Sequence, residues 1–314
     1  MIRIATRSSA LAIAQARQVA DLLGGAELVE VSSDGEPGDK ARFVRGVERA
    51  LLEGEADIGV HSAKDVPAEM PDGLAIAAVP AREDPADVWI GVGTSLDDVP
   101  EGAHVGTASL RRRAQLLAAR PDLQVGELHG NVDTRLRKLA AGEHDAIVLA
   151  AAGLRRLGRE DEASFAIPAE AMTPAAGQGA LILQTRADDA ESTSAAATIG
   201  DETALRELTA ERAVVALLDA TCATPIGARA KLTLGNGAEG PDDPIAAGDR
   251  GEAAAESLSI EAFVGLPDGS EWIRDRFEAD AADPAAAGAQ LAERLLGAGA
   301  REILDRAEDW MPSV

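Results

Sequence analysis

The stretch HVGTASLRRRAQLLAARPDLQVGELHGNVDTRLRKLAAGEHDAIVLAAAG (residues 104–153) decides the fold, because strand-like and helix-like patterns alternate along it. The apolar runs at 104–109, 123–130 and 145–153 predict strands, and VWIGV at 88–92 predicts another. The segments SLRRRAQLLAAR and NVDTRLRKLAAG predict helices. Strands that alternate with helices in this way pair in parallel and build a layered α/β unit.

Residues 1–80 show the same alternation, so a second α/β unit is expected. A helix capped by Ser8 or Ser9 follows the first strand, and a helix over 43–51 ends at Gly54. The strands predicted for this unit lie at 2–6, 27–31, 56–63 and 74–80. Two prolines within 80–85 predict a hinge segment between the units. The strand predicted at 179–186 is a candidate to cross back and complete the first sheet.

The rest of the chain predicts a small antiparallel α+β domain. It opens with a long amphipathic helix at 201–220, and a PDG turn joins its later strands. Asp283 and Pro284 supply the cap and the first-turn proline of another helix. The strands are expected at 228–234, at 257–264 and along EWIRDRF, and residues 236–256 predict a surface loop. The predicted domains are 1–80 with 180–197, then 85–173, then 202–314.

Composition narrows the classes of partner. The net charge of −24 disfavours binding to nucleic acid or to anionic membranes. No apolar run reaches the length of a membrane span, and the N-terminus lacks the pattern of a signal peptide. A lone cysteine forms no intrachain disulfide, so we expect a cytoplasmic protein. Four scattered histidines and one cysteine offer no metal-ligand spacing.

The excess of acidic residues also bears on the environment of the protein. Only four of the 30 basic residues are lysines, and the chain has no tyrosine. A carboxylate-rich surface stays hydrated at high salt, where its self-repulsion is screened. We therefore expect adaptation to high salt. An ordinary acidic protein from a GC-rich genome is the alternative.

Against this acidic background, arginines cluster where a strand runs into a helix. In GTASLRRR (106–113) the helix start offers free N–H groups, the Ser109 hydroxyl and two arginines, Arg111 and Arg112, to an anion. Three successive helical residues cannot share one face, so Arg113 is expected in solvent. An arginine-rich exposed helix is the alternative.

The segment HGNVDTRLRKL (129–139) repeats this arrangement at the next junction. Asn131 is a natural N-cap, and Arg135 lies about one turn inside the helix. Two neighbouring junctions with cationic helix starts would face one crevice. The residues themselves therefore predict a site for a multiply carboxylated small molecule.

Two further segments carry candidate ligand groups. HSAKDVP (61–67) follows a strand, where α/β folds place their ligand sites, and it includes Lys64 and Asp65. A polar turn with a surface Lys–Asp pair is the alternative. In PAAGQGA (174–180) two glycines flank Gln178. Either a close backbone approach to a ligand or a tight crossing between the units would explain them.

The only cysteine, Cys222, lies in the loop ATCATPIGA (220–228) after the long helix. A lone cysteine is commonly a small buried apolar residue. No basic residue lies within five positions of Cys222, so the sequence does not indicate a lowered thiol pKa.

Taken together, these segments resemble the porphobilinogen deaminase (hydroxymethylbilane synthase) family over nearly the whole chain. The matching motifs, in order, are RIATRSSALAIAQ (3–15), HSAKDVP, REDP (82–85), GTASLRRR, GNVDTRL, LAAAGLRRLG (149–158), GQGA, TAERA (209–213) and CATPIGA. The resemblance implies two lobes like those of type II periplasmic binding proteins, followed by a third domain. It also implies a dipyrromethane cofactor joined by a thioether to Cys222.

The activity implied by the resemblance is that of a transferase of tetrapyrrole and haem biosynthesis. Four porphobilinogen molecules are joined head to tail with loss of ammonia, and hydroxymethylbilane is then released by hydrolysis. Asp65 matches the catalytic carboxylate of the family. The residues that match cofactor or substrate contacts are Arg7, Ser9, Lys40, Ser62, Lys64, Ser109, Arg111, Arg112, His129, Asn131, Arg135 and Gln178. The resemblance favours a monomer.

The chain departs from the family pattern at three places. His129 stands where the family usually has an arginine, and a neutral imidazole would bind a carboxylate more weakly. The segment 32–43, which carries Lys40, is short and lacks the usual glycine-lysine-glycine. The acidic stretch 236–256 has the character of an insertion.

Two non-enzymatic classes would use similar lobes. A secreted solute-binding protein would carry a signal sequence and would have no use for Cys222 in a third domain. An intracellular ligand-sensing regulator would carry a basic DNA-binding helical segment, and none is recognisable. The sequence therefore favours the enzyme.

Overall fold

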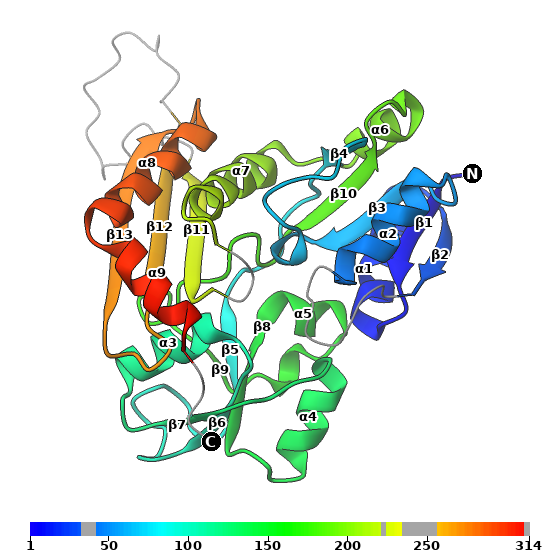
Figure 1. Ribbon diagram of the computed structural model, residues 1–314. Helices are drawn as coiled ribbons and strands as arrows, with labels where there is room; N and C mark the ends of the chain where they lie inside the picture. Colours follow the sequence, from blue (N-terminus) through cyan, green and yellow to red (C-terminus); the bar gives the residue numbers. More distant parts are fainter. Residues whose placement is uncertain (33–41, 221–223, 234–255, 311–314) are drawn as a thin grey trace, which may run out of the picture.

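The computed structural model describes residues 1–32, 42–220, 224–233 and 256–310, and these fold around three sheets (Figure 1). We call the two five-stranded sheets with their helices lobe 1 and lobe 2. Domain 3 is the three-stranded sheet with the helices that cover it.

Lobe 1 is built on a mixed sheet. Its strands, in spatial order, are β2 (Glu27–Val31), β1 (Arg3–Arg7), β3 (Ile58–Ser62), β10 (Leu181–Arg186) and β4 (Leu74–Ala78). β1 pairs in parallel with β2 and β3, whereas β10 runs antiparallel between β3 and β4. The expected return of this late strand to the first sheet is therefore confirmed. Its first five residues are buried, so β10 lies in the core of the lobe.

Lobe 2 repeats the arrangement. Its strands, in spatial order, are β7 (Gln124–Gly126), β6 (His104–Gly106), β8 (Ala146–Ala150), β5 (Asp87–Gly91) and β9 (Phe165–Ala166). β6 pairs in parallel with β7 and β8, and β5 runs antiparallel between β8 and β9. In each lobe the fourth strand thus belongs to a segment that crosses over from the other lobe. The predicted pair of similar α/β lobes of the type II class is confirmed.

Helices flank both sheets. They are α1 (Ala10–Leu22), α2 (Arg42–Leu52) and α6 (Ala190–Ala197) in lobe 1, and α3 (Leu110–Ala119), α4 (Val132–Ala140) and α5 (Ala151–Arg156) in lobe 2. Two short 3-10 turns, η1 (Ala63–Asp65) and η2 (Glu160–Glu162), complete the lobes. Ser9 caps α1, since its hydroxyl accepts a hydrogen bond from the Ala12 amide at 3.3 Å.

Domain 3 is the predicted antiparallel α+β unit. Its strands are β11 (Ile226–Thr233), β12 (Ser257–Gly265) and β13 (Trp272–Asp280), and its helices are α7 (Glu202–Leu217), α8 (Pro284–Gly297) and α9 (Ala300–Glu308). Asp283 caps α8 with Pro284 in the first turn, as expected. α7 and α8 cross closely at Gly288, where a Cβ would lie 2.1 Å from the Ala210 carbonyl oxygen. Only glycine fits at this crossing.

The predicted elements differ from the structure in a few places. The apolar run 145–153 predicted one strand, but β8 ends at Ala150 and α5 begins at Ala151. An apolar run alone does not distinguish a buried strand from a buried helix, and alanine favours the helix. α6, α9 and β9 were not predicted. The surface loop expected at 236–256 falls almost entirely outside the described residues.

Candidate functional site

The candidate site begins where β3 ends. Ser62 is the last residue of this strand, and Lys64 and Asp65 lie in the 3-10 turn that follows. The Ser62 hydroxyl accepts a hydrogen bond from the buried Gln15 amide at 2.8 Å. Among the described residues, none makes a hydrogen bond to the half-buried Asp65 carboxylate. Asp65 is therefore available to accept N–H donors from a ligand.

Gln178 connects this turn to the segment that crosses between the lobes. Its side-chain nitrogen donates to the Pro85 carbonyl at 2.6 Å, which turns its amide oxygen toward Lys64. The Lys64 ammonium donates to that oxygen at 3.3 Å. Gln178 is only 1% exposed, so this contact holds the ammonium of lobe 1 beside the start of lobe 2.

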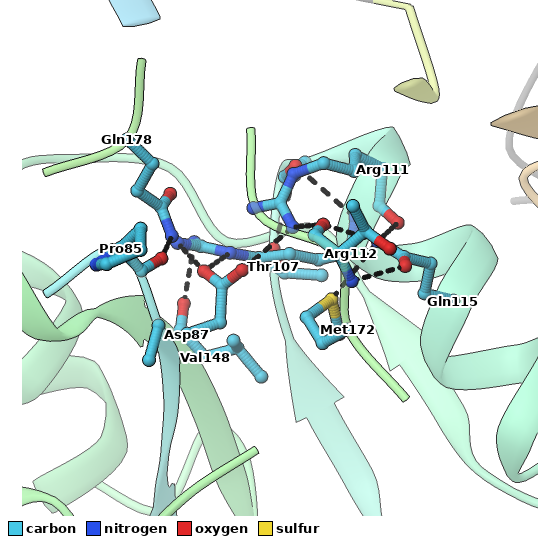
Figure 2. A network of polar contacts seen from close by, with 12 residues as sticks. Pro85, Asp87, Thr107, Arg111, Arg112, Gln115, Val148, Met172 and Gln178 are labelled. Atoms are coloured by element: carbon cyan, nitrogen blue, oxygen red, sulfur yellow. Dashed lines mark hydrogen bonds and ion pairs between the residues drawn. The ribbon is translucent and has the colours of Figure 1, made fainter. Parts of the chain in front are cut away.

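A buried carboxylate, Asp87, holds the two arginines at the start of α3. Arg111 Nη1 lies 2.8 Å from Asp87 Oδ2, and Arg112 Nη2 lies 2.7 Å from Asp87 Oδ1. Arg111 also donates to the Thr173 carbonyl and Arg112 to the Val148 carbonyl, both at 2.8 Å. Figure 2 shows this network with Gln178 beside it.

The charges of the cluster do not balance. Arg111 and Arg112 share the buried carboxylate of Asp87, and the charges of Asp87 and Asp65 also act on Lys64. Burial opposes ionisation of Asp87, but the charges of Arg111 and Arg112 outweigh it and hold its pKa well below the usual range. Burial, followed by the charge of Arg112, lowers the pKa of Lys64 to about 8. A bound anion would relieve this excess of positive charge.

Arg135 adds a fourth cation. Asn131 caps α4, as predicted, because its side-chain oxygen accepts from the Thr134 amide at 2.9 Å. Arg135 donates to the Gly130 carbonyl at 2.8 Å, and no carboxylate among the described residues pairs with it. Burial, with a smaller effect from the charge of Arg112, lowers its pKa to about 10. The charge of Arg112 in the first junction therefore acts on Arg135 in the second.

Other predicted contacts hold local positions. Ser109 caps α3 and accepts from the Arg112 amide at 3.4 Å. Arg7 ends β1 and interacts electrostatically with His61. His129 is 75% exposed and lies 2.7 Å from the Glu127 carboxylate. The structure therefore pairs His129 with an acid of this chain.

The expectation that Arg113 lies in solvent is wrong. Arg113 is half-buried, donates to the Val125 carbonyl and stacks over the Trp310 ring at 4.8 Å from its centroid. Helical geometry does turn it away from Arg111 and Arg112. The face that it occupies is covered by the end of domain 3 instead of water.

The two glycines beside Gln178 mark a crossing of chains. Gly177 and Gly179 both have positive φ, at 72° and 89°. A Cβ at Gly179 would lie 2.2 Å from the Glu83 carbonyl oxygen, and one at Gly177 would lie 2.9 Å from Ala63. Of the two explanations, the tight crossing accounts for both glycines.

Lys40 and Cys222 lie outside the described residues. The helix that leads toward Cys222, α7, ends at Leu217, and the chain is described again from Thr224.

Sequence reasoning missed two buried carboxylates. Asp87 opens β5 two residues after the REDP motif, so an acid at the start of an apolar strand was an available signal. Glu211 lies within the TAERA motif and is fully buried. It accepts from Arg82 at 2.7 Å, from the Gly177 amide at 2.6 Å and from the Ala230 amide at 2.9 Å. Its position in a helix gave no such signal.

The fold and the site define a two-lobed protein of the type II class, with a cation-rich site where the lobes meet. Two solved structures of low identity match part of the chain with low TM-scores. A TRAP periplasmic solute binding protein from Desulfovibrio salexigens is 12% identical, with 65% of this chain and 73% of that chain covered at a TM-score of 0.39. The GluR0 ligand-binding core from Nostoc punctiforme is 14% identical, covering 63% and 91% at a TM-score of 0.34.

The chain belongs to the porphobilinogen deaminase family. The family model "Porphobilinogen deaminase, dipyromethane cofactor binding domain" matches residues 2–194, and "Porphobilinogen deaminase, C-terminal domain" matches residues 205–297. A porphobilinogen deaminase of Syntrophus aciditrophicus is 40% identical, with 99% of this chain and all of that protein covered. One from Brevibacillus brevis is 42% identical over 96% of both chains.

Proposed function

We propose that this chain condenses four porphobilinogen molecules head to tail with loss of ammonia and releases hydroxymethylbilane by hydrolysis. It is then a transferase of tetrapyrrole biosynthesis. The observation that carries the proposal is a cluster of three cations in a chain of this family: Arg111 and Arg112 share the buried carboxylate of Asp87, and Lys64 interacts electrostatically with all three. Porphobilinogen carries an acetate and a propionate, so each added ring brings two negative charges to a site that has an excess of positive charge.

The same cluster fits the dipyrromethane cofactor that the family model names. Lys64 and Arg135 are cations whose hydrogen-bond partners, the Gln178 amide and the Gly130 carbonyl, are neutral. Lys64, Arg111, Arg112 and Arg135 would hold its carboxylates. Guanidinium groups bind carboxylates in two-point fashion, and the Lys64 ammonium would bind as a point charge. When bound, the cofactor supplies a nucleophilic pyrrole carbon.

Asp65 has the position and the freedom for the catalytic carboxylate. It lies beside Lys64 in the turn after β3 and can accept hydrogen bonds from pyrrole N–H groups. A fixed negative charge there stabilises the cation that develops on the substrate as ammonia leaves. Ser9, Ser62, Ser109 and Asn131 border these junctions as further candidate contacts, and we assign Arg7, Lys40 and His129 to the same set from the family motifs.

Cys222 is proposed as the point of covalent attachment because it is the only cysteine and lies in the CATPIGA motif. Intact mass spectrometry of the denatured protein should show an adduct of two linked pyrroles, and peptide mapping should place it on Cys222. Cys222→Ser should lack the adduct and be inactive. An unmodified protein that stays inactive after incubation with porphobilinogen would contradict both the attachment and the activity.

We further propose three domains with the bounds expected from sequence, a monomer and a cytoplasmic location. The three separate sheets support the division into domains. Among the described helices, none is long and apolar enough to cross a membrane.

Adaptation to high salt is the remaining part of the proposal, and the net charge of −24 supports it. Screening of acid–acid repulsion should raise the melting temperature as KCl increases from about 0.1 to about 2 M, a range in which the Debye length falls below about 3 Å. Differential scanning calorimetry measures this, with sucrose of equal osmolarity as the control. An unchanged or falling melting temperature would favour an ordinary acidic protein.

A further inference from the structure

The loop that follows Asp65 has few hydrogen bonds of its own. Residues 66–70 belong to no helix or strand. Pro67 has no amide hydrogen, and the Val66 amide donates back to the Ala63 carbonyl at 3.2 Å. No backbone amide among the described residues donates to the carbonyls of residues 66–68. Something else must therefore fix this loop and the turn that precedes it.

Arg212 supplies the missing donors from domain 3. Its Nη1 donates to the Val66 carbonyl at 3.2 Å, and its Nη2 donates to the carbonyls of Pro67 at 2.7 Å and Ala68 at 2.9 Å. Among the described residues, no carboxylate pairs with Arg212. Burial lowers its pKa, yet the group remains a cation because arginine stays protonated in proteins. One guanidinium thus holds three successive carbonyls.

The helix that carries Arg212 is itself held firmly. The neighbouring residue, Glu211, is fully buried and accepts hydrogen bonds from Arg82, Gly177 and Ala230. α7 then runs on toward the loop of Cys222. Arg212 therefore links the helix before the only cysteine to the loop after Asp65.

We propose that Arg212 is a positioning residue that fixes the Asp65 turn relative to the helix leading to Cys222. This rests on the proposed function. A planar guanidinium suits three carbonyls in a row, whereas the compact ammonium of lysine could reach only part of them. The residue acts through the loop and does not itself touch the substrate. Its loss should slow turnover more than it weakens substrate binding.

The test compares Arg212→Gln, Arg212→Lys and Arg212→Ala with Arg206→Gln. Arg206 lies on the same helix and pairs with Glu202 and Glu256, away from the loop. We expect kcat to fall by about 10- to 100-fold in Arg212→Gln with KM changed less than about threefold, since small misplacements of reacting groups cost about that much. The kcat of Arg212→Lys should lie between those of Arg212→Gln and the unaltered protein. The kcat of Arg206→Gln should equal that of the unaltered protein.

Two readouts distinguish positioning from a loss of folding. Hydrogen–deuterium exchange should rise at 62–70 in Arg212→Gln while the core of lobe 1 stays protected. Millimolar guanidinium should restore part of the turnover of Arg212→Ala. Unaltered kcat in Arg212→Gln would overturn the inference, as would a loss accompanied by exchange throughout the protein and no rescue. An unaltered chain that fails to convert porphobilinogen would instead contradict the proposed function.

Discussion

Asp65, the proposed catalytic carboxylate, differs from the other acid of the cluster in having no internal hydrogen bonds among the described residues. It lies in a short 3-10 turn beside Lys64, and its carboxylate has no hydrogen-bond partner among the described residues. The other acid of the cluster, Asp87, already forms ion pairs with two arginines. Asp65 is therefore the acid of the cluster that can accept hydrogen bonds from a ligand.

Replacing Asp65 by asparagine should lower kcat by about 10²- to 10³-fold, because the fixed charge that opposes the developing cation is removed. The melting temperature should change little, since no described hydrogen bond is lost. A coupled assay of porphobilinogen consumption and a thermal melt measure the two effects. Asp72→Asn, an exposed acid of the same loop, is the matched control. Full activity in Asp65→Asn would remove this residue from the catalytic role.

His61 is a buried titratable group directly before the Asp65 turn. The side-chain nitrogen of Gln184 donates to the Glu48 carboxylate at 3.3 Å, so the amide oxygen of Gln184 faces His61. His61 Nε2 donates to that oxygen at 2.9 Å. Burial lowers the pKa of His61 to about 4, and the charge of Arg7 acts in the same direction. The folded protein thus holds this imidazole neutral.

The lowered pKa predicts how stability depends on pH. His61 has a pKa of about 6.5 in the unfolded chain and about 4 in the folded protein. Between these two pH values only the unfolded chain is protonated at this residue, so the folded protein loses stability as the pH falls through this window. The loss from His61 amounts to about 3 kcal/mol, from about 1.36 kcal/mol per pKa unit. Urea unfolding at several pH values measures it. The difference between the unaltered protein and His61→Gln isolates it, and a difference independent of pH would contradict the assignment.

At the scale of elements, α3 is held in lobe 2 by charge as well as by apolar contacts. Its first turn carries Arg111 and Arg112, both buried, and β5 brings Asp87 between them. Arg113 lies on the side covered by Trp310. The helix start that was predicted to bind anions is therefore already fixed by one internal anion.

Asp87→Asn should destabilise the protein by about 3–5 kcal/mol, because it leaves two buried guanidinium groups without their carboxylate. Urea unfolding gives the free energy. The control is Asp122→Asn, which breaks the more exposed pair with Arg120 and should cost much less stability. Equal effects of the two substitutions would show that Asp87 is not a structural centre of the site.

For the whole molecule, Glu211 is where the three parts of the chain meet. Its carboxylate accepts hydrogen bonds from Arg82 of the crossing segment, from the Gly177 amide in the loop before β10, and from the Ala230 amide of β11. These contacts join segments far apart in sequence. The lobes and domain 3 should therefore unfold together as long as this carboxylate is present.

Glu211→Gln should lower stability by about 3–5 kcal/mol and separate the unfolding of domain 3 from that of the lobes. Differential scanning calorimetry should show one transition for the unaltered chain and two for the variant. Glu207→Gln is the control, because Glu207 has the longer 3.3 Å contact with Arg82 and is less buried. A single unshifted transition in Glu211→Gln would contradict this role.

What the sequence determined by itself is local. The period of apolar residues predicted the strands and most of the helices. The caps Asn131 and Asp283 were predicted, and Ser9 was one of two candidates for the first cap, because a cap bonds only three residues ahead. The arginine-bearing helix starts are equally local. Motif order alone indicated the family, and our proposal that a cofactor is attached to Cys222 rests on that resemblance.

Only the tertiary structure decided which of these charges are already paired. Asp87 reaches Arg111 and Arg112 across strands, Glu211 reaches Arg82 across domains, and Arg113 is covered by Trp310. The glycines around Gln178 likewise proved to serve a crossing of chains. Such contacts join residues distant in sequence, and no periodic pattern encodes them. Packing brings these residues together. Burial then strengthens the interaction of each charge pair and raises the free-energy cost of leaving a charge unpaired.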